Sequence, residues 1–183
     1  MTDDDDRRLL VLYLNDHLAG AYGGAALARR IAREHPDTPE LWRLATEITE
    51  DRDTLVGLMR ALGVRPRWHR MLLGTAAEKA GRLKLNGRVV RRSPLSDLLE
   101  AEAMRAGVQG KIALWRALRA TAASDGPFDS RLRLLEERAG RQAGVLDARQ
   151  AEAAEAVLRA GLARSARTAT APGHAHPTRP GPA

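Results

Sequence analysis

Apolar side chains recur at alternating steps of three and four residues over four long stretches of this sequence. This spacing, which constrains the fold more than any other feature, places apolar positions on one face of an α-helix. Alanine and leucine favour helices and supply most of the apolar residues, whereas aromatic residues, which favour strands, make up only 3% of the chain. The sequence therefore predicts an all-α protein built from four amphipathic helices.

The first two helices are predicted to form an antiparallel hairpin. The first spans residues 5–34 and ends before Pro36, because proline cannot continue a helix. The second begins with Thr38 as its N-cap and Pro39 at its first position. It ends at Gly63, a residue type common just after a helix. Only a few residues separate the two helices, and such short links join antiparallel neighbours.

The last two helices are predicted to form a second hairpin. The third begins at Ser93 and Pro94, and the fourth begins near Asp129 after the break at 124–127. No proline follows until the C-terminal region, so the fourth helix could continue past Ala160, although its two glycines could bend it. From residue 165 the chain is rich in Pro, Gly, Thr and Ala. We therefore expect a bundle over residues 1–164 and a disordered tail over 165–183.

The segment 63–93 joins the two hairpins and is long enough to run back along the bundle. A shorter helix is expected over 68–83, followed by a tight turn at Asn86-Gly87. About 30 residues can span the length of a helical bundle at about 1.5 Å per helical residue and about 3.3 Å per extended one. The sequence thus predicts a partly helical crossover that makes the second and third helices run in the same direction.

This layout, together with the local text, resembles the ferritin-like superfamily, in particular bacterial members of unassigned function. The resemblance runs from Arg8 to Ala163 and includes YLNDHLAGAYGGAALARRIA, AEKAGRLKLNGRVVRRSPLSDLLEAEA and GVQGKIALWRAL. It implies a four-helix antiparallel bundle with a crossover between helices two and three. Its dimetal members carry a Glu on two helices and Glu-x-x-His on the other two. The present sequence has neither Glu-x-x-His motif, which places an oxygen-activating role in doubt.

Each predicted apolar stripe contains at least one polar residue. The stripes are Leu10, Leu14, His17, Ala21, Gly24, Ala28 and Ile31; Leu41, Leu44, Ile48, Asp51, Leu55, Leu58 and Leu62; Leu95, Leu99, Glu102, Ala106, Gln109 and Ala113, with Leu114, Ala117 and Leu118 beyond; and Leu132, Leu135, Ala139, Gln142 and Leu146. If all four stripes face one core, these polar groups form a layer. A buried ion costs several kcal/mol unless it is paired and hydrogen-bonded, so the layer needs compensating partners.

Three interpretations of this layer remain open. The polar side chains could satisfy one another, with His17 paired to Asp51 or Glu102 and the glutamines Gln109 and Gln142 completing the layer. They could instead hold a metal, because His17, Glu47, Asp51 and Glu102 offer the nitrogen and oxygen donors of iron or manganese sites. Finally, a stripe misread by one position would place its polar residues at the surface. No cofactor is expected on the first interpretation, and iron or manganese on the second.

The crossover is strongly basic and suggests a second kind of partner. Its cations are Arg65, Arg67, Arg70, Lys79, Arg82, Lys84, Arg88, Arg91 and Arg92, with one Glu among them. These could neutralise the phosphates of a nucleic acid, and Trp68 could stack on bases. The alternative is a solvated basic face with Trp68 anchoring the crossover on the bundle. The net charge of +7 does not decide between them, because both signs are interspersed along most of the chain.

Composition narrows the remaining possibilities. The chain has no cysteine, which excludes disulfides, thiolate metal sites and cysteine nucleophiles. No apolar run approaches the roughly 20 residues that span a bilayer, so we expect no membrane partner and a cytoplasmic location. Small residues on the first helix, namely Gly20, Gly23, Gly24, Ala25 and Ala28, could support self-association through close helix contact. The sequence thus favours a non-enzymatic structural or interaction protein, with a divergent metal-binding bundle and a nucleic-acid-associated protein as alternatives.

Overall fold

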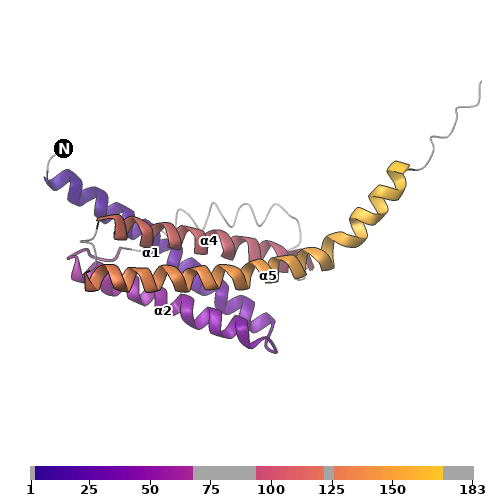
Figure 1. Ribbon diagram of the computed structural model, residues 1–183, viewed down its shortest axis with the longest axis horizontal. Helices are drawn as coiled ribbons and strands as arrows, with labels where there is room; N and C mark the ends of the chain where they lie inside the picture. Colours follow the sequence, from indigo (N-terminus) through magenta and orange to yellow (C-terminus); the bar gives the residue numbers. More distant parts are fainter. Residues whose placement is uncertain (1–2, 68–93, 122–125, 171–183) are drawn as a thin grey trace, which may run out of the picture.

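The computed structural model describes residues 3–67, 94–121 and 126–170 of the 183-residue chain (Figure 1). These residues form four α-helices: α1 (Asp3–Glu34), α2 (Pro39–Ala61), α4 (Pro94–Thr121) and α5 (Pro127–Thr170). No strand occurs among them, which confirms the all-α prediction within this part of the chain. The helix and the turn expected within 68–93 lie outside the described residues.

Contacts between the helices fix their relative directions. Arg30 near the end of α1 lies 2.7 Å from Glu100 near the start of α4, so these helices are antiparallel. On the opposite side, Glu47 contacts Gln142 and Glu50 contacts Arg138, so α2 and α5 are also antiparallel. Each hairpin is antiparallel as well, and α2 and α4 therefore run in the same direction (Figure 1). The predicted direction of the third helix relative to the second is thus confirmed.

The end of α2 shows how the local sequence stops a helix. Gly63 adopts φ +66°, a left-handed conformation that glycine accepts without steric cost. The amide of Val64 donates to the Met59 carbonyl at 2.8 Å and the amide of Gly63 to the Arg60 carbonyl at 3.0 Å. This pair of hydrogen bonds is the Schellman motif, and Val64, the residue after Gly63, is buried. At the other end of α2, Thr38 precedes Pro39 as predicted, but its side chain makes no capping hydrogen bond.

Two apolar clusters fill the interior, one toward each end of the bundle. The cluster near the start of α1 contains Leu14, Leu18, Leu55, Met59, Leu114, Trp115, Leu118, Leu132 and Leu135 among its buried residues. The cluster near the α1–α2 turn is rich in alanine and contains Ala25, Ala28, Ile31, Leu44, Ile48, Met104, Val108, Ala139 and Leu146. Full burial of each large aliphatic side chain contributes about 1.5–3 kcal/mol, so these clusters drive the packing.

The predicted stripes are accurate for two helices and wrong for one. On α5 every stripe residue is buried, and on α2 only Leu62 at the helix end is exposed. On α4 the first six predicted stripe residues, including Glu102 and Gln109, are exposed, whereas Leu114 and Leu118, which extend the predicted stripe, are buried. The buried face of α4 instead consists of Leu98, Ala101, Met104, Val108, Ile112, Trp115 and Leu118. Because α4 carries apolar residues on most sides, two of its faces fit a helical period, and the pattern alone does not distinguish the buried one.

The glycines of α1 do not bring a neighbouring helix close. A Cβ atom added at Gly20, Gly23 or Gly24 would meet no atom within 4 Å. These glycines therefore allow no close approach of another helix within the described chain, and their predicted role in self-association stays a prediction. The close packing of α1 uses Ala25, Ala28 and Ala32 instead, all of which are buried.

Helix α5 is longer than the bundle that it helps to form. It runs for 44 residues without a break at Gly140 or Gly144 and continues to Thr170. The expected start of a disordered tail at residue 165 is therefore too early, because the helix extends through the first six residues of that range. Figure 1 shows the last part of α5 extending past the ends of the other described helices. Within the described residues, no helix has both the length and the apolar character needed to cross a membrane.

Candidate functional site

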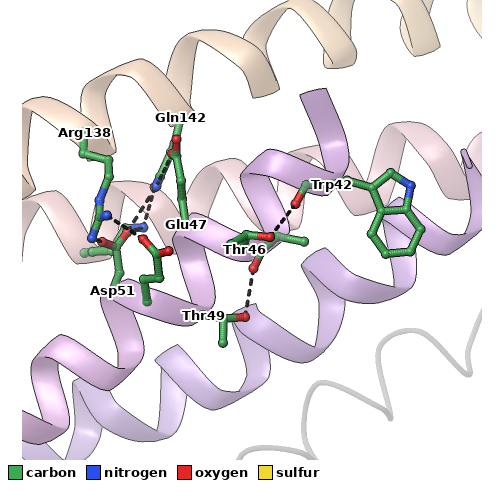
Figure 2. Close-up of polar contacts among 10 residues, drawn as sticks. Trp42, Thr46, Glu47, Thr49, Asp51, Arg138 and Gln142 are labelled. Atoms are coloured by element: carbon green, nitrogen blue, oxygen red, sulfur yellow. Dashed lines mark hydrogen bonds and ion pairs between the residues drawn. The ribbon is translucent and has the colours of Figure 1, made fainter. Parts of the chain in front are cut away.

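The most deeply buried charged group in the bundle is the carboxylate of Asp51. Its side chain is 1% exposed, and it lies on α2 between the two apolar clusters. Lys111 of α4 donates from Nζ to Asp51 Oδ2 at 2.6 Å. Arg138 of α5 donates from Nη2 to Asp51 Oδ1 (Figure 2). Each carboxylate oxygen thus receives a hydrogen bond from a cation on a different helix. Hydrogen bonds of this charge-assisted kind are about twice as strong as neutral ones.

Gln142 completes the arrangement and is itself 1% exposed. Its Oε1 accepts from Lys111 Nζ at 2.5 Å. Its Nε2 donates to Glu47 Oε2 at 3.0 Å and to Asp51 Oδ2 at 3.2 Å (Figure 2). An amide with a cation at its oxygen and carboxylates at its nitrogen has both ends satisfied. We call Glu47, Asp51, Lys111, Arg138 and Gln142 the central cluster.

The central cluster balances its own charge. Glu47 and Asp51 supply two negative charges, and Lys111 and Arg138 supply two positive ones. Outside it, the exposed Glu50 accepts a further hydrogen bond from Arg138 Nη1 at 3.0 Å. Burial lowers the pKa of Lys111, an effect that the charge and hydrogen bond of Asp51 oppose and that nearby Arg138 reinforces. The ammonium group is therefore held in place mainly by Asp51 against a substantial cost of desolvation.

A dimetal centre does not fit these residues. In the described part of the chain, no group of three or more His, Cys, Asp or Glu side chains is arranged to hold a metal ion. Both oxygens of Asp51 already accept hydrogen bonds from protein cations. A metal would have to displace an ammonium and a guanidinium group and then leave them buried beside its own positive charge. In this geometry Glu47, Asp51 and Gln142 satisfy one another only together with the two cations Lys111 and Arg138, which the first interpretation did not include.

Only part of the predicted site is brought together. Glu47, Asp51 and Gln142 meet as expected, whereas Glu102 and Gln109 lie exposed on the outer face of α4. His17 is half-buried, and its ring packs edge-to-face on Tyr13 with the ring centroids 4.6 Å apart. Burial lowers the pKa of His17, and the neighbouring Asp16 only partly offsets this effect. The predicted pairing of His17 with Asp51 or Glu102 is therefore wrong.

The sequence reasoning missed the two cations that neutralise Asp51. Lys111 is one of three lysines in a chain that has 27 arginines, and the other two lie in the crossover. In a sequence that otherwise uses arginine, a single lysine inside a helix was a usable signal. Arg138 precedes Gln142 by four residues and so lies on the same face of α5. The position of Arg138 next to the buried stripe could have identified it as a partner of the buried carboxylate of Asp51.

A second polar group lies at the end of the bundle where α1 turns into α2. Here the ring of His35 lies 3.3 Å from Asp97 and about as close to Arg149, whose Nη2 is 3.0 Å from its Nε2. These side chains line a small crevice that also contacts Ile31, Leu41 and Leu146. The group links the end of α1, the start of α4 and the middle of α5. It holds this end of the bundle together.

A third polar group joins α4 to α5 at the opposite end. Asp129, on the first turn of α5, accepts from Arg119 Nε at 3.1 Å and from Arg133 Nη2 at 2.9 Å. Glu136 accepts from Arg116 at 2.6 Å and from Arg119 at 2.7 Å. These hydrogen bonds lower the pKa values of both carboxyl groups. Asp129 also complements the N-terminal dipole of α5.

Only the first two cations of the predicted basic surface lie among the described residues. Arg65 and Arg67 are exposed, and Asn15 of α1 holds the backbone between them. Asn15 Nδ2 donates to the Arg65 carbonyl at 3.4 Å, and the Arg67 amide donates to Asn15 Oδ1. Arg70, Lys79, Arg82, Lys84, Arg88, Arg91 and Arg92 lie outside the described residues. Binding of nucleic acid through this segment stays a prediction.

Comparison with known proteins adds no family to this description. No protein-family model, no curated protein and no solved structure matches the chain. The functional argument therefore rests on the residues and their contacts.

Proposed function

We propose that this chain is a non-enzymatic helical bundle, ferritin-like in layout, that serves as a structural or interaction module. The observation that carries the proposal is the environment of Asp51, whose carboxylate oxygens are bound by Lys111 and Arg138. In this proposal the protein's own cations occupy the place that metal ions hold in dimetal bundles. The centre is then a structural element that specifies how the two hairpins dock.

The contacts of the central cluster support a docking role. It joins α2 of the first hairpin to α4 and α5 of the second. Apolar contacts tolerate sliding and rotation between helices, whereas a buried ion leaves its partner unpaired when the register shifts. A register error of one turn would separate Asp51 from both cations. The cluster therefore favours one alignment of the hairpins over the others.

Metal binding provides the test of this proposal. We would measure bound iron, manganese and zinc, together with thermal shifts on their addition, for the purified chain and for Asp51→Asn. We expect neither stoichiometric metal nor a metal-induced shift in either protein. A metal bound in one or two equivalents, with a thermal shift that Asp51→Asn removes, would overturn the proposal in favour of a divergent metal-binding bundle.

A second variant guards against an uninformative result. Replacing both Lys111 and Arg138 by methionine frees the Asp51 carboxylate while keeping side chains of similar length. If this double variant folds and binds metal where the unchanged protein does not, the cations are what exclude the metal. If neither protein binds metal, the carboxylates lack a metal-binding geometry even without them. Both outcomes for the double variant are consistent with a structural role for the central cluster. Only metal binding by the unchanged protein contradicts that role.

A further inference from the structure

His35, the first residue after α1, lies between two groups of opposite charge that come from two other helices. Asp97 of α4 faces the imidazole ring, with its Oδ1 3.3 Å from Nε2. Arg149 of α5 contacts the same ring, with its Nη2 3.1 Å from Nδ1 and 3.0 Å from Nε2. None of these residues belongs to the central cluster. Their role is therefore a separate question from the docking of the two hairpins.

The backbone holds His35 in place on both sides. Its amide donates to the carbonyls of Ile31 and Ala32 in the last turn of α1, and its own carbonyl accepts from the amide of Thr38. The side chain is partly buried between the helices. A change in the charge of the ring is thus expected to move the partners of His35 rather than His35 itself.

The neutral ring satisfies both of its neighbours, and the protonated ring satisfies only one. The tautomer with hydrogen on Nε2 donates to Asp97 and accepts from Arg149 at Nδ1. The protonated ring carries hydrogen on both nitrogens, so it has no acceptor left for a guanidinium group. It also places a positive charge in contact with the positive charge of Arg149. Protonation therefore strengthens the contact with Asp97 and opposes the contact with Arg149.

Arg149 already has a second partner on its own helix. Its Nη1 donates to Oε2 of Glu152, three residues further along α5, at 3.2 Å. This ion pair balances the charge of the guanidinium group after it leaves His35. The separation of Arg149 from His35 consequently leaves no unpaired cation behind.

The other charged groups near His35 make their contacts elsewhere. Glu100 of α4 lines the same crevice, and its Oε1 accepts from Arg30 of α1 at 2.7 Å. Helix α2 lines the crevice with an apolar side chain. The charged side chains next to His35 in the chain, at positions 33, 34 and 37, are exposed. The charged groups that contact the ring are thus the carboxylate from α4 and the guanidinium from α5.

The contact between Arg149 and His35 lies where α5 leaves the bundle. Past this contact Ala153 is buried, whereas Leu158 and Leu162 are exposed. Figure 1 shows the helix continuing beyond the other described helices. Because little apolar surface holds this part of α5, the polar contact of Arg149 is expected to have a large effect on its direction.

We propose that His35 is a pH-dependent switch that controls the direction of the last part of α5. When the pH falls from about 8 to about 5.5, the ring takes up a proton, keeps Asp97 and releases Arg149 to Glu152. The part of α5 after Arg149 is then free to pivot while the bundle stays folded. Carboxyl groups ordinarily titrate near pH 4, so histidine is the residue type that changes its charge in this interval.

Spin labels can measure the direction of α5, because the chain has no cysteine of its own. We would label the double variant Arg43→Cys and Ala156→Cys, with one exposed site on α2 and one past the switch on α5. Double electron–electron resonance then gives the distribution of distances between the labels. We expect a narrow distribution at about pH 8 and a clearly broader or shifted one at about pH 5.5. Equal distributions at the two pH values would overturn the switch.

Substitutions of His35 in the labelled chain isolate the imidazole. His35→Gln donates and accepts without titrating, and it is expected to keep the narrow distribution at both pH values. His35→Lys carries a positive charge at both and is expected to give the broad or shifted distribution throughout. His17 remains in place in both variants, so its titration does not distinguish them. A pH effect in His35→Gln as large as in the unchanged chain would assign the movement to another group.

Arg149→Gln tests the partner that the switch releases. Without the guanidinium charge the protonated ring repels nothing on α5, so the distance distribution is expected to be independent of pH. Arg141→Gln, at an exposed position on the same helix, is the matched control and is expected to keep the pH effect. Equal pH effects in the two variants would contradict the role of Arg149.

Two further measurements separate the switch from general acid unfolding. Circular dichroism of the unchanged chain is expected to show the same helix content at about pH 8 and about pH 5.5. Loss of helix content at the lower pH would overturn the proposal, because the switch leaves the bundle folded. The ring resonances of His35, assigned from their loss in His35→Gln, report its protonation by NMR. A ring that stays neutral at about pH 5.5 would overturn the proposal as well.

Discussion

Lys111 and Asp51 are 60 residues apart in the sequence and meet at 2.6 Å in the interior, where the lysine comes from α4 and the aspartate from α2. Among the described residues, neither forms an ion pair within its own hairpin, where Lys111 contacts only the uncharged amide oxygen of Gln142. This pair, together with Arg138, therefore joins α2 of one hairpin to α4 and α5 of the other. The contribution of the Lys111–Asp51 pair to the free energy of unfolding can be measured.

Lys111→Met is expected to lower the free energy of unfolding by about 3 kcal/mol, because it leaves a buried carboxylate with one cation instead of two. Urea denaturation followed by circular dichroism would measure the change. Arg105→Met is the matched control, since it breaks the Arg105–Asp147 pair at the surface of the same helix and is expected to cost under about 1 kcal/mol. Equal losses of unfolding free energy for the two substitutions would contradict the larger stabilising role that we assign to Lys111.

The lowered pKa of Lys111 can be observed directly. Because the chain has only three lysines, the 13Cε resonance of Lys111 can be assigned from its loss in Lys111→Met. It is expected to titrate below its ordinary value of 10.5, mainly because burial penalises the charged form. The unfolded chain then binds more protons than the folded one between the lowered value and 10.5, so this group makes stability rise with pH across that interval. A pKa at or above 10.5 would contradict the buried environment.

Acid is expected to weaken the group that joins α4 to α5 at Asp129 and Glu136. Arginine hydrogen bonds lower the pKa of both carboxyl groups below 3.8 and 4.5 respectively. Their contribution is therefore fully present above these ordinary values and is lost as the pH falls through the lowered folded-state values. Arg119→Gln is expected to flatten the acid limb of stability plotted against pH, and Arg131→Gln, at an exposed position on α5, is expected to leave it unchanged. Identical curves for both variants would show that Arg119 has no such role.

Substitution of helical glycines is expected to stabilise the protein. A Cβ atom at Gly23 or Gly107 meets nothing within 4 Å, and alanine favours a helix interior over glycine by about 0.5–1 kcal/mol. Gly23→Ala and Gly107→Ala should each raise the free energy of unfolding by that amount. Gly63→Ala should lower it, because its φ of +66° is unfavourable for alanine. Destabilisation by Gly23→Ala, or its dissociation of an oligomer, would instead support self-association through the glycine face of α1.

The sequence predicted the fold best where one face of a helix was clearly more apolar than the rest. The stripes of α2 and α5 have polar residues on their other faces, so Asp51 and Gln142 were placed correctly in the interior. Proline and glycine also located every helix end to within a few residues, apart from the end of α5. On α4 two faces compete, and no local signal shows which one the other helices cover.

The partners in the central cluster were harder to predict, because they depend on distances between helices. A stripe identifies which side chains face the interior. It does not give the position along the bundle axis at which each side chain meets a neighbouring helix. His17 therefore looked equivalent to Asp51 in the pattern, although it packs on Tyr13 of its own helix. Long cations were missed for a related reason. Lys111 and Arg138 lie at the margin of the buried faces and reach the centre through their flexible side chains.

The parallel course of α2 and α4 has a consequence for the order of folding. Each hairpin is built from neighbouring sequence and can close quickly, whereas the meeting of Asp51 with Lys111 requires a loop of 60 residues to close. We therefore expect the hairpins to form first and the ion cluster to assemble last. Substitutions in the cluster would then mainly accelerate unfolding and leave the folding rate almost unchanged. The buried charges would thus act late, and determine how long the native state persists once it has formed.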